Sequence, residues 1–514
     1  MAYFVRALDV LEITGDQNGQ AILTTNLGDA YFHLDRYPES LEAYQQSYEF
    51  RQALGDERGM GWALTNIGAV YRELNEFNIA VERYDQALQI HQRYGDLNGR
   101  ATTINNRAVA LHDLGNLQLA AEGYQEAMEL WEDLGHSYGV AAVQINLGDL
   151  YKNLGQFEQS WAYYQAAAEA FRDLGNPGEE AIALTGLGSV RQYLSDYSGA
   201  IEYYQQALEI HDRIGNLSGR GTVLHNVASV FDAQGEYTAA IDNYMSALEI
   251  DRQIGDRLSE ASTLSALGLT YTHRGDYASA METLEEAVSI AEETGSQEIL
   301  ISAVNNLSLA EHALAYFDRA IERLLNIESV AREMDNPSSL ASILNNLGFT
   351  YEAMGDYEQA QFYFEQALEL FEKNGDLSGK ANALNNIAGI HLSRSDYEMA
   401  LQSYLEAAGI AEEIGARSQT MTTINNIGMV YLDLGMPDQA RESIEEAISL
   451  AREIGNTGAE ASSLNNLGMV MVALGDHASA KDNYLAALTL HVNSGARQGQ
   501  LRVLNNLGTM LIKD

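Results

Sequence analysis

Asparagine recurs at intervals of 40 residues along this chain of 514 residues. The column begins at Asn26 and ends at Asn506, and only Gly186 and Ala266 interrupt it. A column of glycines runs in step with it. A fixed period of this length is typical of stacked repeats, in which a single unit cannot bury its apolar face alone. The chain is therefore expected to fold as a solenoid with one continuous core.

Each unit of 40 residues is expected to form two helices. In residues 56–95, Asp56 follows Gly55, as an N-cap follows a left-handed C-cap glycine. Apolar residues then recur at helical spacing in two stretches separated by a short turn at Asn75-Glu76. Because no stretch alternates as a strand does and the chain has only four prolines, we predict an all-α fold. The same N-cap is expected at Asp16, Asp96, Asn176, Asn216, Asp256, Asn336, Asp376 and Asn456.

Two columns of small residues indicate close helix packing. Position 28 and its equivalents are always Gly, Ala or Ser, and position 40 and its equivalents are always Ser or Ala. Small residues on facing helices let the backbones approach closely, beside aromatic residues such as Tyr84. We therefore expect each helix pair to be held by a small-to-aromatic contact.

The repeat resembles the tetratricopeptide repeat (TPR). The residues that carry the resemblance are Leu347, Gly348, Tyr351, Gly355, Tyr357, Ala360, Phe364, Ala367 and Leu368. The match covers essentially the whole chain, with a period six residues longer than the usual 34. This longer variant is similar to the repeats of kinesin light chains, of Gα-binding spindle-orientation adaptors and of bacterial TPR regions fused to CHAT-type or signalling modules. The resemblance implies a right-handed superhelix of antiparallel helix pairs that binds peptides or regulates an attached domain.

The register predicts one continuous array with an incomplete unit at each end. Residues 1–14 align with a second helix, residues 15–494 hold twelve repeats, and residues 495–514 align with a first helix. Neither end has the polar capping helix that solenoids normally carry. This favours a fragment of a longer protein, or ends that stack on another copy, although Asp9, Glu12 and Lys513 could also solvate the ends.

One unit, over residues 296–336, departs from the pattern. Ser308 replaces the small glycine, Glu311 replaces the aromatic residue, Ala315 replaces the turn glycine and Asp335 replaces the capping glycine. Two interpretations are open: a local hinge or change of superhelical pitch, or neutral drift.

The sequence favours binding over catalysis. Its 11 histidines are dispersed, and it contains no zinc-protease, phosphate-loop, nucleophile-elbow or dinucleotide-binding motif. His91, His211 and His491 share a column but lie in distant units, so they cannot converge on one ion. The absence of cysteine excludes disulfides and thiolate zinc sites. We therefore expect no enzymatic activity, no metal and no cofactor.

The net charge of −43 disfavours nucleic acid and anionic membranes as partners. It suits a protein or peptide of basic or amphipathic character. The alternative is that the charge serves only to keep a long solenoid dissolved. The N-terminus lacks the apolar core of a signal peptide, and no run of residues approaches the length of a membrane span. The sequence thus predicts a cytoplasmic protein.

The asparagine column is the first candidate binding feature. The resemblance implies that the first helix of each pair lines the concave face. An amide carries both donors and an acceptor, so it can bind an extended peptide backbone whatever its side chains. Neighbouring units would place such amides about 10 Å apart, or about three residues of extended peptide. The alternative is that the amides bond across the seam between helices. The candidate groove asparagines are Asn26, Asn66, Asn106, Asn146, Asn306, Asn346, Asn386, Asn426 and Asn466.

The second candidate is the column of Asp29, three residues after the asparagine. Polar and small residues dominate its first half and apolar ones its second half. An apolar stripe beside an amide ladder would suit an amphipathic peptide with basic flanks, or it could be buried by packing of unit on unit. The candidate groove residues here are Leu269, Leu309, Phe349, Met429 and Met469.

The sequence therefore predicts a non-catalytic interaction scaffold that binds a peptide along its concave groove. Two alternatives remain open. One is a regulatory or sensor arm of a larger signalling protein, and the other is a structural solenoid that associates end to end.

Overall fold

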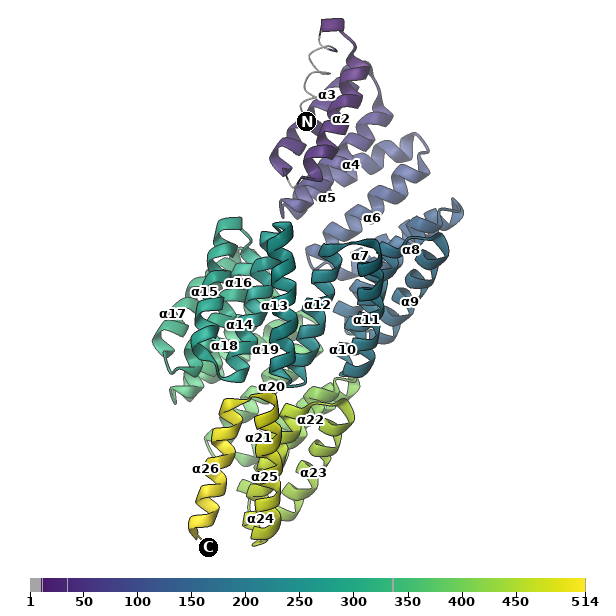
Figure 1. The fold of residues 1–514 in the computed structure, drawn as a ribbon. Helices are drawn as coiled ribbons and strands as arrows, with labels where there is room; N and C mark the ends of the chain where they lie inside the picture. The colour runs from purple at the N-terminus through teal and green to yellow at the C-terminus, as the bar shows by residue number, and fades with distance from the viewer. Residues whose placement is uncertain (1–10, 12, 35, 335–336, 514) are drawn as a thin grey trace. The chain divides into compact units, whose positions relative to one another are not determined.

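The structure, a computed structural model, describes residues 11, 13–34, 36–334 and 337–513. Every regular element in these ranges is a helix, and consecutive helices run antiparallel as hairpins (Figure 1). The all-α prediction is confirmed. No helix in the described ranges combines the length and the apolar composition needed to cross a membrane.

The helices alternate as first and second members of pairs. The first helices are α2 (Gln17–Phe32), α4 (Glu57–Glu73), α6 (Leu97–Asp113), α8 (Ser137–Asn153), α10 (Pro177–Tyr193), α12 (Leu217–Ala233), α14 (Arg257–Arg274), α16 (Gln297–Ala313), α18 (Pro337–Ala353), α20 (Leu377–Ser393), α22 (Arg417–Asp433), α24 (Thr457–Ala473) and α26 (Arg497–Lys513). The second helices are α3 (Tyr37–Leu54), α5 (Phe77–Arg93), α7 (Leu117–Asp133), α9 (Phe157–Leu174), α11 (Tyr197–Ile214), α13 (Tyr237–Ile254), α15 (Tyr277–Thr294), α17 (Phe317–Glu333), α19 (Tyr357–Asn374), α21 (Tyr397–Glu413), α23 (Pro437–Ile454) and α25 (His477–Ser494). Most of the predicted orphan helix over residues 1–14 lies outside the described residues.

The chain divides into two compact units, Met1–Ala183 and Leu184–Asp514, with the boundary inside α10. We call them unit 1 and unit 2. Unit 1 contains α2 to α9, and unit 2 contains α11 to α26. Each unit is built from the same helix pairs.

Side-chain caps start many of the first helices, as predicted. The Asp56 carboxylate accepts the backbone N–H of Gly59 at 2.9 Å, and Gly55 ends the preceding helix in the left-handed conformation, at φ 69°. Such a cap satisfies one of the free N–H groups at a helix start. The cap at Asn336 lies outside the described residues. The caps confirmed by a side-chain hydrogen bond are Asp16, Asp56, Asp96, Asn216, Asp256, Asp376 and Asn456.

A contact between a small residue of the first helix and a large buried side chain of the second, often a glycine against a ring, holds the pairs together. A Cβ added at Gly348 in α18 would lie 2.7 Å from the ring of Phe364 in α19, and one added at Gly68 would lie 2.6 Å from the ring of Tyr84. Phe364 is completely buried. Because the ring fills the space that a side chain would need, this column must stay small. The predicted small-to-aromatic contact is confirmed in pairs such as α4 with α5 and α18 with α19, whereas Leu284 and Ile444 take the place of the ring opposite Gly268 and Gly428.

The first helices lie on the inner side of each unit. The first helices of neighbouring pairs contact one another directly, for example α14 with α16 and α22 with α24. Second helices of neighbouring pairs make at most sparse contact in the described ranges. A stack curves toward the side on which its elements are closer together, so the first helices form the concave face.

Unit 2 also contains a seam between turns far apart in the sequence. The Gln234 carbonyl oxygen accepts the Gly458 N–H at 3.2 Å and the Thr457 hydroxyl at 3.1 Å. The Ser195 hydroxyl accepts the Ser418 N–H at 3.1 Å, and the Gln498 amide donates to the Tyr277 hydroxyl at 3.0 Å. The paired residues are 221 to 224 apart in the sequence, so each contact spans more than five repeats. We call this set of contacts the inter-turn seam.

The irregular unit keeps regular helices. Glu311 is fully buried, and its carboxylate pairs with Arg319 at 3.1 Å and Arg323 at 3.0 Å. Ala315 adopts the left-handed conformation of the glycine that it replaces, at φ 60°. An ion-pair cluster therefore stands where other units carry an aromatic residue, while Asp335 lies outside the described residues.

Gly348→Ala is expected to destabilise the chain by about 1–3 kcal/mol, because the new Cβ would press on a buried ring that cannot move away. The matched control is Gly409→Ala in α21, where a Cβ meets nothing within 4 Å. That change should be neutral or stabilising by up to about 1 kcal/mol, since alanine favours a helix interior over glycine. Urea unfolding midpoints measure both. Equal effects of the two substitutions would contradict the packing role.

Gly235→Ala tests the inter-turn seam against Gly355→Ala. The two glycines have φ of 78° and 80°, so alanine pays the same left-handed strain of about 1–2 kcal/mol at both. Only at Gly235 does the added Cβ meet another backbone, 2.9 Å from the Gly458 Cα. Gly235→Ala should therefore lower the melting temperature more and speed amide hydrogen exchange in residues 455–460. If the two variants melt together with unchanged exchange, the seam contributes nothing to stability.

Candidate functional site

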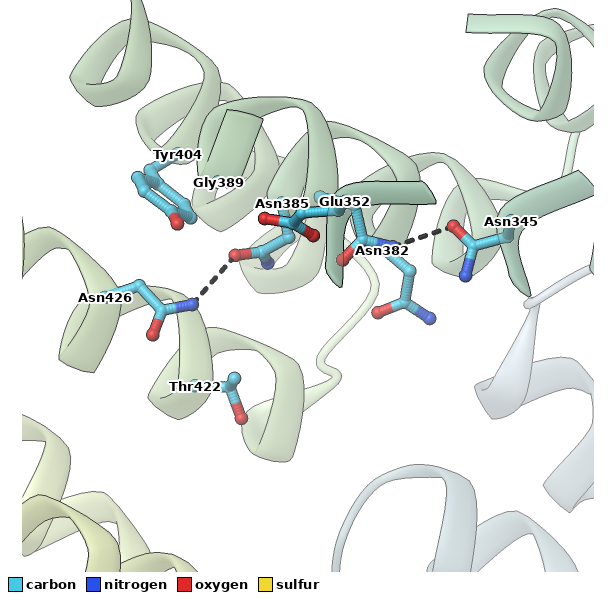
Figure 2. Close-up of a pocket in the computed structure, with 9 residues that line it drawn as sticks. Asn345, Glu352, Asn382, Asn385, Gly389, Tyr404, Thr422 and Asn426 are labelled. Atoms are coloured by element: carbon cyan, nitrogen blue, oxygen red, sulfur yellow. Dashed lines mark hydrogen bonds between the residues drawn. The ribbon is translucent and has the colours of Figure 1, made fainter. Parts of the chain in front are cut away.

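The asparagine column forms a ladder of amide hydrogen bonds between first helices. Asn386 Nδ2 donates to Asn345 Oδ1 at 2.7 Å, and Asn426 Nδ2 donates to Asn385 Oδ1 at 3.3 Å (Figure 2). The acceptor lies 41 residues before the donor, so each bond joins neighbouring pairs. The other rungs are Asn146 to Asn105 at 3.0 Å, Asn346 to Asn305 at 2.8 Å, Asn466 to Asn425 at 3.2 Å, Asn506 to Asn465 at 3.0 Å, and Asn306 to the Ser265 hydroxyl at 3.0 Å.

The acceptor column was not predicted from the sequence. It is the residue immediately before each ladder asparagine, and from residue 305 onward that residue is also asparagine in every unit. The signal that could have revealed it is this repeated Asn-Asn dipeptide, since a second amide column implies a partner for the first. The ladder thus consists of two columns that bond across the repeat.

All but one of the predicted groove asparagines are half-buried. Asn26 is exposed. The half-buried ones are Asn66, Asn106, Asn146, Asn306, Asn346, Asn386, Asn426 and Asn466. A half-buried amide on the concave face keeps part of its polar surface open to solvent while bonding its neighbour.

The apolar column lies beside the ladder, three residues further along each first helix. Phe349 is 41% exposed and stacks on the His312 ring, with ring centroids 4.4 Å apart. Met429 and Met469 are half-buried and pack partly against the core of their own repeats. Leu269 and Leu309 are half-buried as well. The stripe is therefore only partly covered, with Phe349 as its most open member.

A hollow interrupts this stripe at Gly389. It has a volume of about 400 Å³, and Figure 2 shows residues of four helices around it. Phe349 and Met429 occupy the column in the neighbouring repeats, but Gly389 has no side chain to fill the space. The lining residues are Asn345 and Glu352 of α18, Asn382, Asn385, Asn386 and Gly389 of α20, Tyr404 of α21, and Thr422 and Asn426 of α22.

Two titratable groups face the hollow with shifted pKa values. Burial raises the pKa of the Glu352 carboxyl above its usual range. Burial and the nearby Glu352 charge raise the pKa of Tyr404 to about 12. Neither side chain forms a hydrogen bond or ion pair with any residue that the structure describes. The hollow therefore contains a carboxylate without a cation and a phenol without a partner.

The histidine column packs between repeats. His91, His211 and His491 are buried at the end of second helices, where each ring faces a glycine of the next first helix. Burial lowers the pKa of all three, to about 4 for His491. Over the described part of the chain, no cluster of three or more His, Asp or Glu side chains could hold a metal ion.

A sequence profile described as "Tetratricopeptide repeat" matches most of the chain. The matched ranges are 19–93, 99–173, 139–213, 219–293, 299–373, 339–413, 379–453 and 419–491. The chain belongs to the tetratricopeptide repeat family. Repeats of this family typically mediate protein–protein interactions. Comparison with curated proteins finds no match.

Several solved structures are similar to this TPR array. BtubC (BKLC) from P. vanneervenii is 20% identical with a TM-score of 0.35, over 43% of this chain and 90% of that one. A Rap protein in complex with Competence and Sporulation Factor is 17% identical with a TM-score of 0.48, over 69% of this chain and 98% of that one. A signal transduction ATPase with a TPR sensor, from Pyrococcus horikoshii, is 15% identical with a TM-score of 0.40, over 68% of this chain and 55% of that one. At these identities the likeness concerns the fold alone.

The triple substitution Asn386→Ala, Asn426→Ala and Asn466→Ala is expected to lower stability, because each change removes an inter-repeat hydrogen bond worth about 1 kcal/mol. The measurement is the urea midpoint together with the melting temperature. An unchanged melting temperature would mean that the ladder serves binding without supporting the fold.

The matched control for this triple variant removes three hydroxyls, each from the position four residues before the ladder asparagine of its own repeat. It is Ser342→Ala, Thr422→Ala and Ser462→Ala, whose hydroxyls bond only the carbonyl four residues earlier in their own helix, at 3.1, 3.0 and 3.1 Å. Their loss breaks no bond between repeats, so stability should change by less than about 0.5 kcal/mol for each substitution.

Proposed function

We propose that this TPR array is a non-catalytic interaction scaffold that binds an extended peptide along the concave face of unit 2. The ladder asparagines and the apolar column from Leu269 to Met469 form the floor of the groove. The peptide is basic or amphipathic, and its backbone lies against the amides.

The observation that carries the proposal is the half-open stripe of amides and apolar side chains on one face. In unit 2 the ladder bonds use one N–H of each asparagine and leave part of its surface accessible. Phe349, at 41% exposure, offers an aromatic surface in the same stripe. An extended chain can exchange backbone hydrogen bonds with such amides and place alternate side chains on the apolar positions.

Charge supports a basic partner. The net charge of −43 gives the whole protein a field that attracts cations and raises their association rate. Such attraction is screened by salt, with a Debye length of about 8 Å at physiological ionic strength. The affinity for a basic peptide is therefore expected to fall as salt rises, while the apolar contacts persist.

The test is selection from a random peptide library on the wild-type protein, followed by affinity measurement on two charge-matched variants. The groove variant is Phe349→Asp with Met429→Asp. The control is Phe362→Asp with Leu405→Asp, which adds the same charge at apolar residues of second helices that are each 54% exposed. Melting curves establish that both variants are folded.

We expect wild type and control to bind the same basic or amphipathic peptides, and the groove variant to bind them at least about tenfold more weakly, a difference of 1.4 kcal/mol. Equal affinity of all three proteins would exclude this face as the site. If no peptide is enriched and the protein's mass grows with concentration, end-to-end assembly replaces peptide binding as the function.

A further inference from the structure

Gly389 is a glycine that packing does not require. A Cβ added there would lie 3.6 Å from Glu352 Oε1 and 3.9 Å from the Tyr404 hydroxyl, which are ordinary contact distances. At Gly348, by contrast, the added Cβ would collide with a buried ring. Glycine destabilises a helix interior relative to alanine, so its presence at residue 389 calls for another reason. That reason is the hollow that the glycine leaves open.

The tyrosine beside this hollow lacks a partner that two of its equivalents in unit 1 have. The hydroxyls of Tyr44 and Tyr164 donate to Asp29 and Asp149, at 2.6 and 2.5 Å. Those aspartates stand in the column that holds Gly389. Tyr404 is only 4% exposed, yet its hydroxyl bonds no described residue and faces the hollow (Figure 2). The ring is packed in the core, and the hydroxyl is free to accept a hydrogen bond from a group in the hollow.

The ladder leaves amide oxygens without a donor beside the hollow. The Nδ2 groups of Asn386, Asn426 and Asn385 already donate, the last to the Thr423 hydroxyl at 2.6 Å. No described residue donates to Oδ1 of Asn386 or Asn426. With the unpaired Glu352 carboxylate, the hollow presents two amide oxygens and a carboxylate. A group that carries only donors and a positive charge complements this set.

We propose that the hollow at Gly389 binds the side chain of a lysine or arginine of the bound peptide. This inference rests on the proposed function, because the basic residue belongs to the peptide in the groove. The charged head pairs with Glu352 and donates to the asparagine oxygens and the Tyr404 hydroxyl. Its aliphatic stem occupies the space that Phe349 and Met429 fill in the neighbouring repeats.

The geometry also gives the spacing of the recognised sequence. Phe349 and Met429 lie one repeat before and one repeat after Gly389. Neighbouring helices are about 10 Å apart, which an extended peptide spans with about three residues. The recognised segment therefore has a basic residue with an apolar residue three positions to either side.

The probe is a synthetic peptide with lysine at its centre, leucine three residues to each side, and glycine and serine elsewhere. Its partner probe replaces the lysine by norleucine, which keeps the stem and removes the charge.

Fluorescence anisotropy measures the affinity of both peptides for the wild type, Glu352→Gln and Gly389→Met. Glu352→Gln keeps the side-chain shape, and Gly389→Met fills the hollow with the residue of the next two repeats. Tyr404→Phe serves as a second variant that keeps the buried ring.

We expect the wild type to bind the lysine peptide about tenfold more tightly than the norleucine peptide, or better. Glu352→Gln should lose this preference while it still binds the norleucine peptide. Of these variants, Gly389→Met should weaken the binding of the lysine peptide most. Equal binding of both peptides by the wild type, abolished by the Phe349→Asp and Met429→Asp changes, would overturn the pocket and leave the proposed function standing. Failure of the wild type to bind either peptide would count against the proposed function itself.

A third arm separates a peptide side chain from a free amine. n-Butylammonium carries the same charged head and stem as lysine without a backbone. We expect it to bind far more weakly than the lysine peptide, because it forms no contact with Phe349, Met429 or the ladder. If it binds as tightly as the peptide and the Phe349→Asp change has no effect, the hollow is a site for small amines and the proposal is wrong.

Discussion

The contact between a small residue on the first helix and a large side chain on the second sets the geometry of the array. At Gly348 and Gly68 the ring of the partner helix lies where a side chain would start. The same space is taken by Leu284 opposite Gly268 and by Ile444 opposite Gly428. Because the interhelical distance is fixed in each pair by this contact, first helices recur at a regular spacing. The regular spacing in turn allows a 2.7 Å amide bond from one pair to the next.

The amide ladder joins neighbouring repeats and also limits which ligands the groove can bind. The rungs from Asn386 and Asn426 use one N–H of each asparagine and leave its amide oxygen without a donor. These free acceptors agree with the negative charge of the whole chain. Selectivity then depends on the neighbouring column, which changes from Phe349 to Gly389 to Met429 along the face. A repeated residue positions the partner, and a varied residue distinguishes one partner from another.

Much of this was predictable because it is local. The caps, the two small columns and the helix pairs each depend on positions within about one repeat, and the period makes those positions visible. The asparagine column is visible in the sequence. The acceptor column one residue earlier is less regular, since it holds Thr65, Ile145 and His225 in the first half of the chain. Glu311 was recognised as a departure, although its ion pairs with Arg319 and Arg323 depend on side-chain directions that a pattern does not give. Gly389 interrupts the apolar column in the sequence, but only the packing around it reveals the hollow.

The inter-turn seam could not be predicted, because its residues meet at a separation of 221 to 224 residues, which is not a whole number of repeats. That separation is five and a half periods. A turn inside one pair therefore meets a turn between two others, as Gln234 meets Thr457. Solenoids commonly gain or lose whole repeats, since each unit contacts only its neighbours. Here a duplication or deletion between Tyr277 and Ser418 would put every seam contact out of register together, so the number of repeats in this stretch is constrained by contacts that other stretches of the array lack.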